Sequence, residues 1–439
     1  MHSISSNDLA APVGQSERIV ILDSLRGIAL LGILMMNMPF FALPYPVPET
    51  LVLRNEWGTI NEKAWYIVNW LLEGSQRGLF SLLFGAGVIL FITRLEKRMS
   101  GMMPAEYFLR RQLWLLVFGL INAFVFLWPG DILFQYAICG IIVFVFHRLP
   151  VKGLLIAAGV CLLLMTAREN RNLYKDKSII RKGEAVARLD TTKVKLNDQQ
   201  KDELGAMTGL RERFDSATQR KEMEKNLREI RGTYGQTYNN LSNVSSKLEF
   251  YYTYYGLWDI LLFMFLGMAF YKSGVLTGQA STKIYWWLFI VGLGAGLLIS
   301  YFRLQPMLET RFNRFLFIKK VPIEFYEISR TLRSLGIFGL IMLLYKSGWF
   351  NWLFRLMRPV GQMAFTNYLM QSLIGAILFF GVGFGMYGKL QRYEIYYVVL
   401  AVWLLEITWS HVWLRYFRFG PLEWLWRSLT YWKWQPIKK

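Results

Sequence analysis

The chain has 439 residues, of which 54% are hydrophobic and 16% aromatic, and only 18% are charged. Soluble globular proteins usually carry about 25% charged residues. The apolar residues also come in uninterrupted runs of about 20 residues, the length that spans a bilayer as a helix. Composition and patterning therefore exclude an ordinary soluble globular protein and predict an all-α, polytopic membrane helix bundle.

The net charge of +20 is strongly basic. Nucleic-acid binding is one interpretation of such a charge, but the cations mostly flank apolar runs and no nucleic-acid motif accompanies them. We therefore favour loops that lie against anionic membrane lipids, and we predict no nucleic-acid partner. The two cysteines, Cys139 and Cys161, lie inside apolar runs and are predicted to be packing residues. We predict no metal site.

Hydropathy predicts about ten transmembrane helices, with ends uncertain by several residues. Their ranges are 19–43, 63–95, 108–128, 131–147, 151–168, 254–272, 281–302, 328–346, 360–382 and 392–416. The second range is longer than one crossing needs. Its first part, Glu62 to Glu73, is therefore predicted to be an interfacial or re-entrant helix that leads into the span.

The chain divides into five predicted segments. They are a cytoplasmic tail at 1–18, an N-terminal membrane bundle of about five spans at 19–168, a charged helical insertion at 169–250, a C-terminal membrane bundle of about five spans at 251–418, and an interfacial helix with a cytoplasmic tail at 419–439. The insertion has good helix formers and opposite charges three or four residues apart, which favours solvated helices. We predict that it is periplasmic.

The short connections that are rich in lysine and arginine fix the predicted orientation. They lie at 94–111, 148–152 and 346–358 and in the C-terminal tail, and with ten spans all of them fall on one side. Because short cationic loops stay in the cytoplasm, we predict a plasma (inner) membrane protein with both termini inside. The 303–327 loop is cationic yet falls outside. It is either a tolerated exception, which we favour, or an outer entrance that attracts anions.

Polar groups inside the first span are candidates for function, because ionisable side chains are costly in hydrocarbon. Asp23 and Arg26 are three residues apart and can pair on one helix face. Asn37 follows Arg26 by eleven residues, so it lies on nearly the same face and about 16 Å further along the helix. Either these residues form a polar path from the cytoplasmic surface, or they form a structural ion pair. The sequence leaves both interpretations open.

Further acids and amides lie at other membrane positions. Glu73 and Arg77 are spaced to pair at the outer surface or to line a vestibule. Asp131 follows a Pro-Gly turn, where an acid commonly caps the next helix. Asn122 lies deep in the preceding span and is predicted to line a cavity. The ninth span carries five polar residues, Gln362, Thr366, Asn367, Gln371 and Ser372. We predict that this helix lines a cavity, although such side chains also form bonds between helices.

Five motifs together resemble the YeiB-like family of bacterial membrane proteins, a domain of unknown function. They are the segment that begins DSLRG at Asp23 and ends at Asn37, LFSLLFGAG at 79–87, GDIL with YA at 130–137, GQMAFTNYLMQS at 361–372 and FGPLEWLWRSLTY at 419–431. The family in turn is similar to the transmembrane acyltransferase superfamily, which shares the D-x-x-R-G opening of the first span.

This resemblance implies that an acyl group passes from cytoplasmic acetyl-CoA, or another acyl-CoA, to a small-molecule or glycan acceptor outside. Asp23 and Arg26 would then order the cytoplasmic entrance, and Asn37 would lie along the path. The cations Arg110 and Arg111 would meet the CoA phosphates.

The sequence departs from the superfamily at the expected base. Characterised relatives use a deep histidine, whereas Asn122 stands at the corresponding place here, and asparagine cannot act as a base. Asp131 and Glu73 are then the candidate catalytic residues, since either carboxylate could act as the base if burial raised its pKa. The alternative is a non-enzymatic protein that binds or transports a small molecule or lipid on the same scaffold. Abundant aromatic residues and glycines are also compatible with a homodimer.

Overall fold

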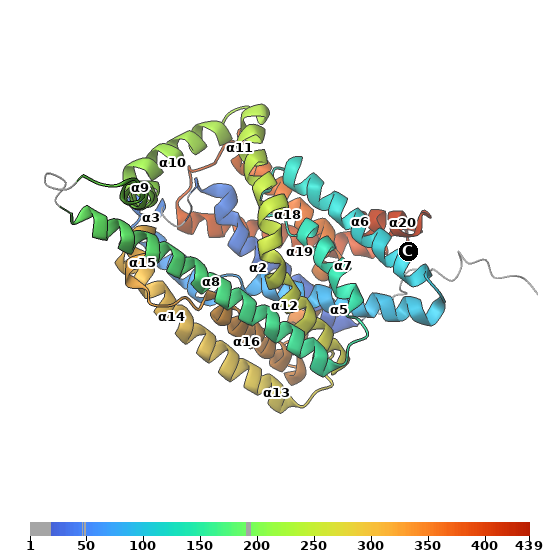
Figure 1. The fold of residues 1–439 in the computed structure, drawn as a ribbon. Helices are drawn as coiled ribbons and strands as arrows, with labels where there is room; N and C mark the ends of the chain where they lie inside the picture. The colour runs from blue at the N-terminus through green and yellow to red at the C-terminus, as the bar shows by residue number, and fades with distance from the viewer. Residues whose placement is uncertain (1–18, 46, 48–49, 190–194) are drawn as a thin grey trace, which may run out of the picture.

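The computed structural model describes residues 19–45, 47, 50–189 and 195–439, and nearly all of its secondary structure is helical (Figure 1). Within these ranges the only β pairing is an isolated bridge between Phe417 and Lys438. The prediction of an all-helical protein is therefore confirmed.

The helices fall into three successive groups along the chain. The first contains α2 (Val20–Ala42), α3 (Thr50–Leu53), α4 (Ile60–Leu72), α5 (Ser75–Arg98), α6 (Met103–Phe124), α7 (Leu133–Val145) and α8 (Val151–Ala187). The second contains α9 (Asp198–Arg213), α10 (Ser216–Ile230), α11 (Tyr234–Ser246) and the π-helix η2 (Lys247–Tyr252). The third contains α12 (Thr253–Lys272), α13 (Thr282–Trp287), η3 (Leu288–Leu293), α14 (Gly294–Glu309), α15 (Arg314–Lys320), α16 (Tyr326–Ser347), α17 (Asn351–Gln362), α18 (Ala364–Phe379), α19 (Arg392–Tyr416) and α20 (Pro421–Tyr431).

Seven helices in the described part of the chain are long and apolar enough to cross a membrane. They are α2 (Val20–Ala42), α4 continued by α5 (Ile60–Arg98), α8 (Val151–Ala187), α12 (Thr253–Lys272), α13 continued by η3 and α14 (Thr282–Glu309), α16 (Tyr326–Ser347) and α19 (Arg392–Tyr416). The three other predicted spans correspond to α6, to the short apolar helix α7, and to α17 with the short apolar helix α18. Helices of this length and composition make the chain a multi-pass integral membrane protein.

The expected break between α4 and α5 occurs at Gly74, whose φ of +71° is a left-handed conformation that favours glycine. A helix that ends inside a protein leaves backbone carbonyl groups without partners. Here the fully buried side chain of Arg333 donates to the carbonyl oxygens of Asn69, Trp70 and Glu73 at 2.9, 2.9 and 3.1 Å. The guanidinium on α16 thus satisfies the end of α4 and fixes the two helices together.

The bundle has two distinct ends (Figure 1). At one end, here called the insertion end, α10 contacts the loop after α18 through a bond from the Gly381 amide to the Ile230 carbonyl (2.9 Å). At the other, the C-terminal end, α20 packs on α6, and the Trp426 indole donates to the Arg111 carbonyl at 2.9 Å. The insertion and the C-terminal helix therefore close opposite ends of the bundle.

Glycines allow α2 and α17 to touch backbone to backbone. A Cβ atom on Gly361 would lie 1.7 Å from the carbonyl oxygen of Asp23, and one on Gly27 would lie 2.3 Å from that of Met357. The Ser24 hydroxyl also donates to the Phe354 carbonyl at 2.9 Å. This close approach holds the start of α2, with its polar residues, against α17.

The substitution Gly361→Ala is predicted to destabilise the protein by about 1–3 kcal/mol, because the added methyl group overlaps backbone that cannot move independently. Thermal unfolding in detergent should show a lower midpoint than for the wild type. Gly159→Ala in α8 is the matched control, since nothing lies within 4 Å of its added Cβ. Equal midpoints for the two variants would contradict the close packing of α2 and α17.

Candidate functional site

The polar start of α2 is held in place from two directions. The Arg26 guanidinium and the Asp23 carboxylate pair at 3.0 Å, as their spacing predicts. The Gln362 side chain, at the end of α17, donates to the other Asp23 oxygen at 3.3 Å. The side chain of Arg26 is 28% exposed while that of Asp23 is 10% exposed, so the pair points its cation outward.

Three arginines from three helices converge at the C-terminal end of the bundle. Arg26 of α2 and Arg427 of α20 both lie close enough to Arg111 of α6 for their charges to repel its charge. Aromatic rings support two of them, because Arg111 stacks 3.5 Å from the centroid of Trp426 and Arg427 stacks 4.5 Å from that of Phe419. We call Arg26, Arg111 and Arg427 the arginine cluster.

The neighbouring Arg110 is engaged by other groups. It pairs with Glu106 and donates to the Thr430 carbonyl at 3.3 Å. It also lies over the rings of Tyr107 and Trp432. Of the two predicted phosphate-binding arginines on α6, the structure therefore brings only Arg111 close to Arg26.

A buried carboxylate fastens α20 to the start of α18. Glu423 accepts hydrogen bonds from the amides of Phe365 and Thr366 at 2.7 and 3.0 Å and from the Thr366 hydroxyl at 2.5 Å. Burial raises the pKa of the Glu423 carboxyl, while the donors on Thr366 and Phe365 oppose the rise. A carboxylate at the first amides of a helix is stabilised there, so Glu423 sets the position of α20.

An apolar groove of about 490 Å³ lies beside this contact. It is lined by Met363, Thr366, Met370, Trp409, Val412, Trp413, Tyr416, Phe417 and Pro421. Five of the side chains predicted to line a cavity are Asn122, Gln362, Thr366, Asn367 and Gln371, and of these Thr366 is the one found in this groove.

The other four form hydrogen bonds between segments. Gln362 contacts Asp23, as described above, and Asn122 donates to Asp131 at 2.8 Å. The Asn367 amide donates to the Ser410 hydroxyl at 3.1 Å and accepts from the Trp409 indole at 2.6 Å. Gln371 donates to Glu406 at 3.1 Å. For these four residues the structure therefore favours the alternative of interhelical bonding.

Asp131 is buried and has three donors around it. Besides Asn122, the Phe134 amide donates to it at 2.9 Å and the Tyr368 hydroxyl lies 3.5 Å away. The carboxylate therefore both holds the first turn of α7, as predicted, and connects that turn to α18. Glu249 of η2 lies near it and is itself buried, and neither of its carboxylate oxygens has a partner among the described residues.

Glu73 and Arg77 do not pair with each other, so the first of the two predicted alternatives, a local ion pair, is wrong. Glu73 pairs with Arg303 of α14, and Arg77 pairs with Asp259 of α12. Both partners come from distant parts of the chain, so local spacing did not reveal them. Asn37 is half-buried, and no hydrogen bond from its side chain to another described residue is found.

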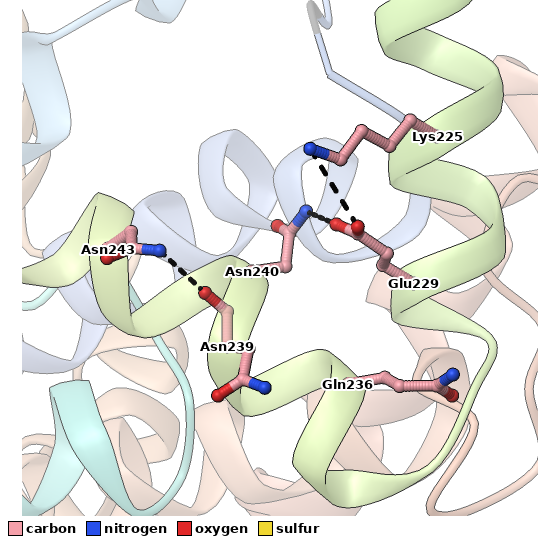
Figure 2. Close-up of a pocket in the computed structure, with 6 residues that line it drawn as sticks. All are labelled: Lys225, Glu229, Gln236, Asn239, Asn240 and Asn243. Carbon is pink, nitrogen blue, oxygen red and sulfur yellow. Dashed lines mark hydrogen bonds and ion pairs between the residues drawn. The ribbon is translucent and has the colours of Figure 1, made fainter.

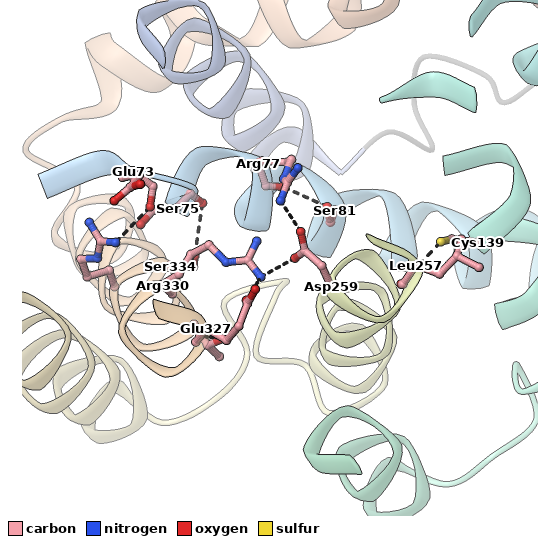
Figure 3. Close-up of polar contacts among 12 residues, drawn as sticks. Glu73, Ser75, Arg77, Ser81, Cys139, Leu257, Asp259, Glu327, Arg330 and Ser334 are labelled. Carbon is pink, nitrogen blue, oxygen red and sulfur yellow. Dashed lines mark hydrogen bonds and ion pairs between the residues drawn. The ribbon is translucent and has the colours of Figure 1, made fainter. Parts of the chain in front are cut away.

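A buried ion-pair network surrounds Asp259 (Figure 3). The fully buried Arg330 of α16 reaches both Asp259 and Glu327 at 2.5 Å, and Arg77 of α5 reaches Asp259 as well. Three membrane-spanning helices therefore meet at one carboxylate. The sequence signal was the presence of Asp259 and Arg330 inside apolar runs, but it did not indicate which charges pair.

A second cavity, of about 430 Å³, lies in the insertion between α10 and α11 (Figure 2). Its lining is polar and consists of Lys225, Glu229, Gln236, Asn239, Asn240 and Asn243. It lies at the end of the bundle opposite the arginine cluster, and no residue of the candidate site lines it.

The fold and these buried polar contacts define the class of the protein as a polytopic helical membrane protein. The model of a family described as "Protein of unknown function (DUF418)" matches residues 270–433. The chain is 30% identical to the uncharacterized protein YxaH of Bacillus subtilis over 98% of both chains. It is 29% identical to the uncharacterized protein YeiB of Escherichia coli, over 94% of this chain and 96% of that one.

The chain therefore belongs to the DUF418 family, which confirms the YeiB-like resemblance in its sequence. A third relative, described as an uncharacterized 39.9 kDa protein in the amylase 3′ region of Bacillus acidopullulyticus, is 27% identical over 96% of both chains. No solved structure matches the chain.

The substitution Asp259→Asn is predicted to destabilise the protein by about 3–5 kcal/mol, because it leaves the buried Arg330 without its central counter-charge. Thermal unfolding or urea unfolding in detergent measures the loss. Asp198→Asn is the control, because its pair with Lys201 is solvent-exposed and is worth at most about 1 kcal/mol. A stability of Asp259→Asn equal to that of the control would show that the network is not structural.

Proposed function

We propose that the protein is a transmembrane acyltransferase that takes an acyl group from acyl-CoA in the cytoplasm and transfers it to an extracytoplasmic acceptor. The observation that carries the proposal is the arginine cluster. Guanidinium groups bind phosphate through paired hydrogen bonds, and no carboxylate pairs with Arg111 among the described residues. Three neighbouring arginines, two of them stacked on aromatic rings, suit the phosphates of CoA.

The proposal places the C-terminal end of the bundle in the cytoplasm of the cell, and hence the protein in the plasma membrane. The cationic connections between α5 and α6 and between α16 and α17 are at this end, in agreement with the preference of short basic loops for the cytoplasm. The insertion, with α9 to α11, is then extracytoplasmic.

On two of the helices that supply the cluster, an asparagine follows the arginine by eleven positions. Asn37 follows Arg26 on α2, and Asn122 follows Arg111 on α6. Eleven residues are about three helical turns, so each asparagine lies on nearly the same face as its arginine and about 16 Å further into the membrane. This repeated spacing supports a polar path from the cluster toward Asp131.

In the proposed reaction Asp131 is the base. It accepts the proton of an acceptor hydroxyl while the hydroxyl oxygen attacks the thioester carbonyl carbon. The new C–O bond forms, the C–S bond breaks, and the CoA thiol leaves with that proton. Glu73 does not have this role in the proposal, because it is paired with Arg303.

A second candidate function is non-enzymatic binding or transport of a small amphipathic molecule or lipid. The apolar groove between α18 and α19 favours it, since such a groove accepts an apolar chain without any chemistry. The hydrogen bonds of four predicted cavity residues to other side chains also favour it, because these bonds occupy polar groups that a reaction site would need.

Titration calorimetry of the purified protein with acetyl-CoA is predicted to give micromolar binding. Arg111→Gln should weaken that binding at least tenfold, a loss of about 1.4 kcal/mol, because it removes a phosphate partner. Arg110→Gln is the matched control, since the adjacent arginine is occupied by Glu106 and α20. Equal effects of the two substitutions, or no binding at millimolar acetyl-CoA, would contradict the proposal.

A separate assay distinguishes the enzyme from the binding protein. Release of CoA thiol from acetyl-CoA by protein in native membrane vesicles should be lost in Asp131→Asn, while the calorimetric affinity stays within about twofold. Binding without any thiol release in the wild type would favour the second candidate.

A further inference from the structure

Two short chains of contacts connect the apolar groove to the arginine cluster. Thr366, which lines the groove, bonds to Glu423 of α20, and Arg427 follows Glu423 by one helical turn. Trp413, on the opposite wall, donates from its indole to the carbonyl of Phe419 at 2.9 Å, and Arg427 stacks on that phenylalanine ring. The groove and Arg427 are therefore neighbours at this end of the bundle.

The first residue of the groove also adjoins the polar start of α2. Met363 lines the groove, and the preceding Gln362 bonds to Asp23, the partner of Arg26. Two members of the arginine cluster, on two different helices, are thus only one or two contacts away from the apolar lining.

The groove itself is chemically suited to a hydrocarbon chain. Its lining is methionine, valine, proline and aromatic side chains with one threonine hydroxyl, and that hydroxyl is already bonded to Glu423. Methionine side chains adapt their shape to flexible apolar ligands. Val412 and Tyr416 on its rim are exposed on the outside of the bundle, so a chain can enter sideways from the membrane.

We propose that the groove holds the hydrocarbon chain of a long-chain acyl-CoA whose phosphates lie on the arginine cluster, so that a fatty acyl-CoA is preferred over acetyl-CoA as the acyl donor. This inference rests on the proposed function for the CoA part of the ligand. It adds the chain length, which the charge argument does not supply. A two-carbon acyl group leaves a groove of about 490 Å³ without an occupant, whereas an amphipathic anion matches both the groove and the cations.

The test compares acetyl-CoA with octanoyl-CoA by titration calorimetry on the full chain in phosphatidylcholine nanodiscs. Because each buried methylene favours binding, octanoyl-CoA is expected to bind at least tenfold more tightly than acetyl-CoA. Val412→Trp fills the groove from its rim and is expected to abolish that difference. Leu404→Trp is the matched control, because Leu404 is exposed on the same helix and does not line the groove.

Equal affinity of the wild type for the two ligands, or a difference that survives Val412→Trp, would overturn the inference while leaving acetyl-CoA binding, and the proposed function, intact. Failure of both ligands to bind would overturn the proposed function itself. Loss of octanoyl-CoA binding on adding phosphatidylglycerol to the nanodiscs would assign the groove and the arginines to an anionic lipid, and would also overturn the inference.

Discussion

The organisation of this protein depends on one constraint, which is that a charge or a hydrogen-bonding group buried among apolar helices must have a partner. Asp259 satisfies it by joining Arg330 and Arg77, which links α12, α16 and α5. Arg333 donates hydrogen bonds to the backbone carbonyl groups at the end of α4, which would otherwise lack partners. Since apolar surfaces give little preference for one neighbour over another inside a membrane, these specific polar contacts determine which helices meet and at what height.

The same constraint explains what the sequence predicted well. Apolar runs of membrane length identify the long helices, because no other backbone arrangement is satisfied in hydrocarbon. Gly74 marks the break between α4 and α5, and the spacing of Asp23 and Arg26 predicts their pair. Each of these signals is local, so a single stretch of sequence contains all of it.

The prediction failed where the partner is distant in the chain. Glu73 and Arg77 have the spacing of a local pair, yet each bonds to a residue more than 180 positions away. Similarly, the amides of the ninth span have the density of a cavity lining, but Asn367 and Gln371 are bonded to Ser410 and Glu406 of α19. Periodicity gives the face of a helix and not the identity of the helix opposite, so these pairings required the three-dimensional structure.

The arginine cluster gathers three cations from three helices at one end of the bundle, and it carries the functional account. Its members are placed by α2, α6 and α20, and α20 is itself fixed by Glu423 on α18. The most direct test is an experimental structure of the protein in nanodiscs with an acyl-CoA. The account predicts density for the CoA phosphates against Arg26, Arg111 and Arg427. Density for the CoA phosphates at any other place on the protein would contradict it.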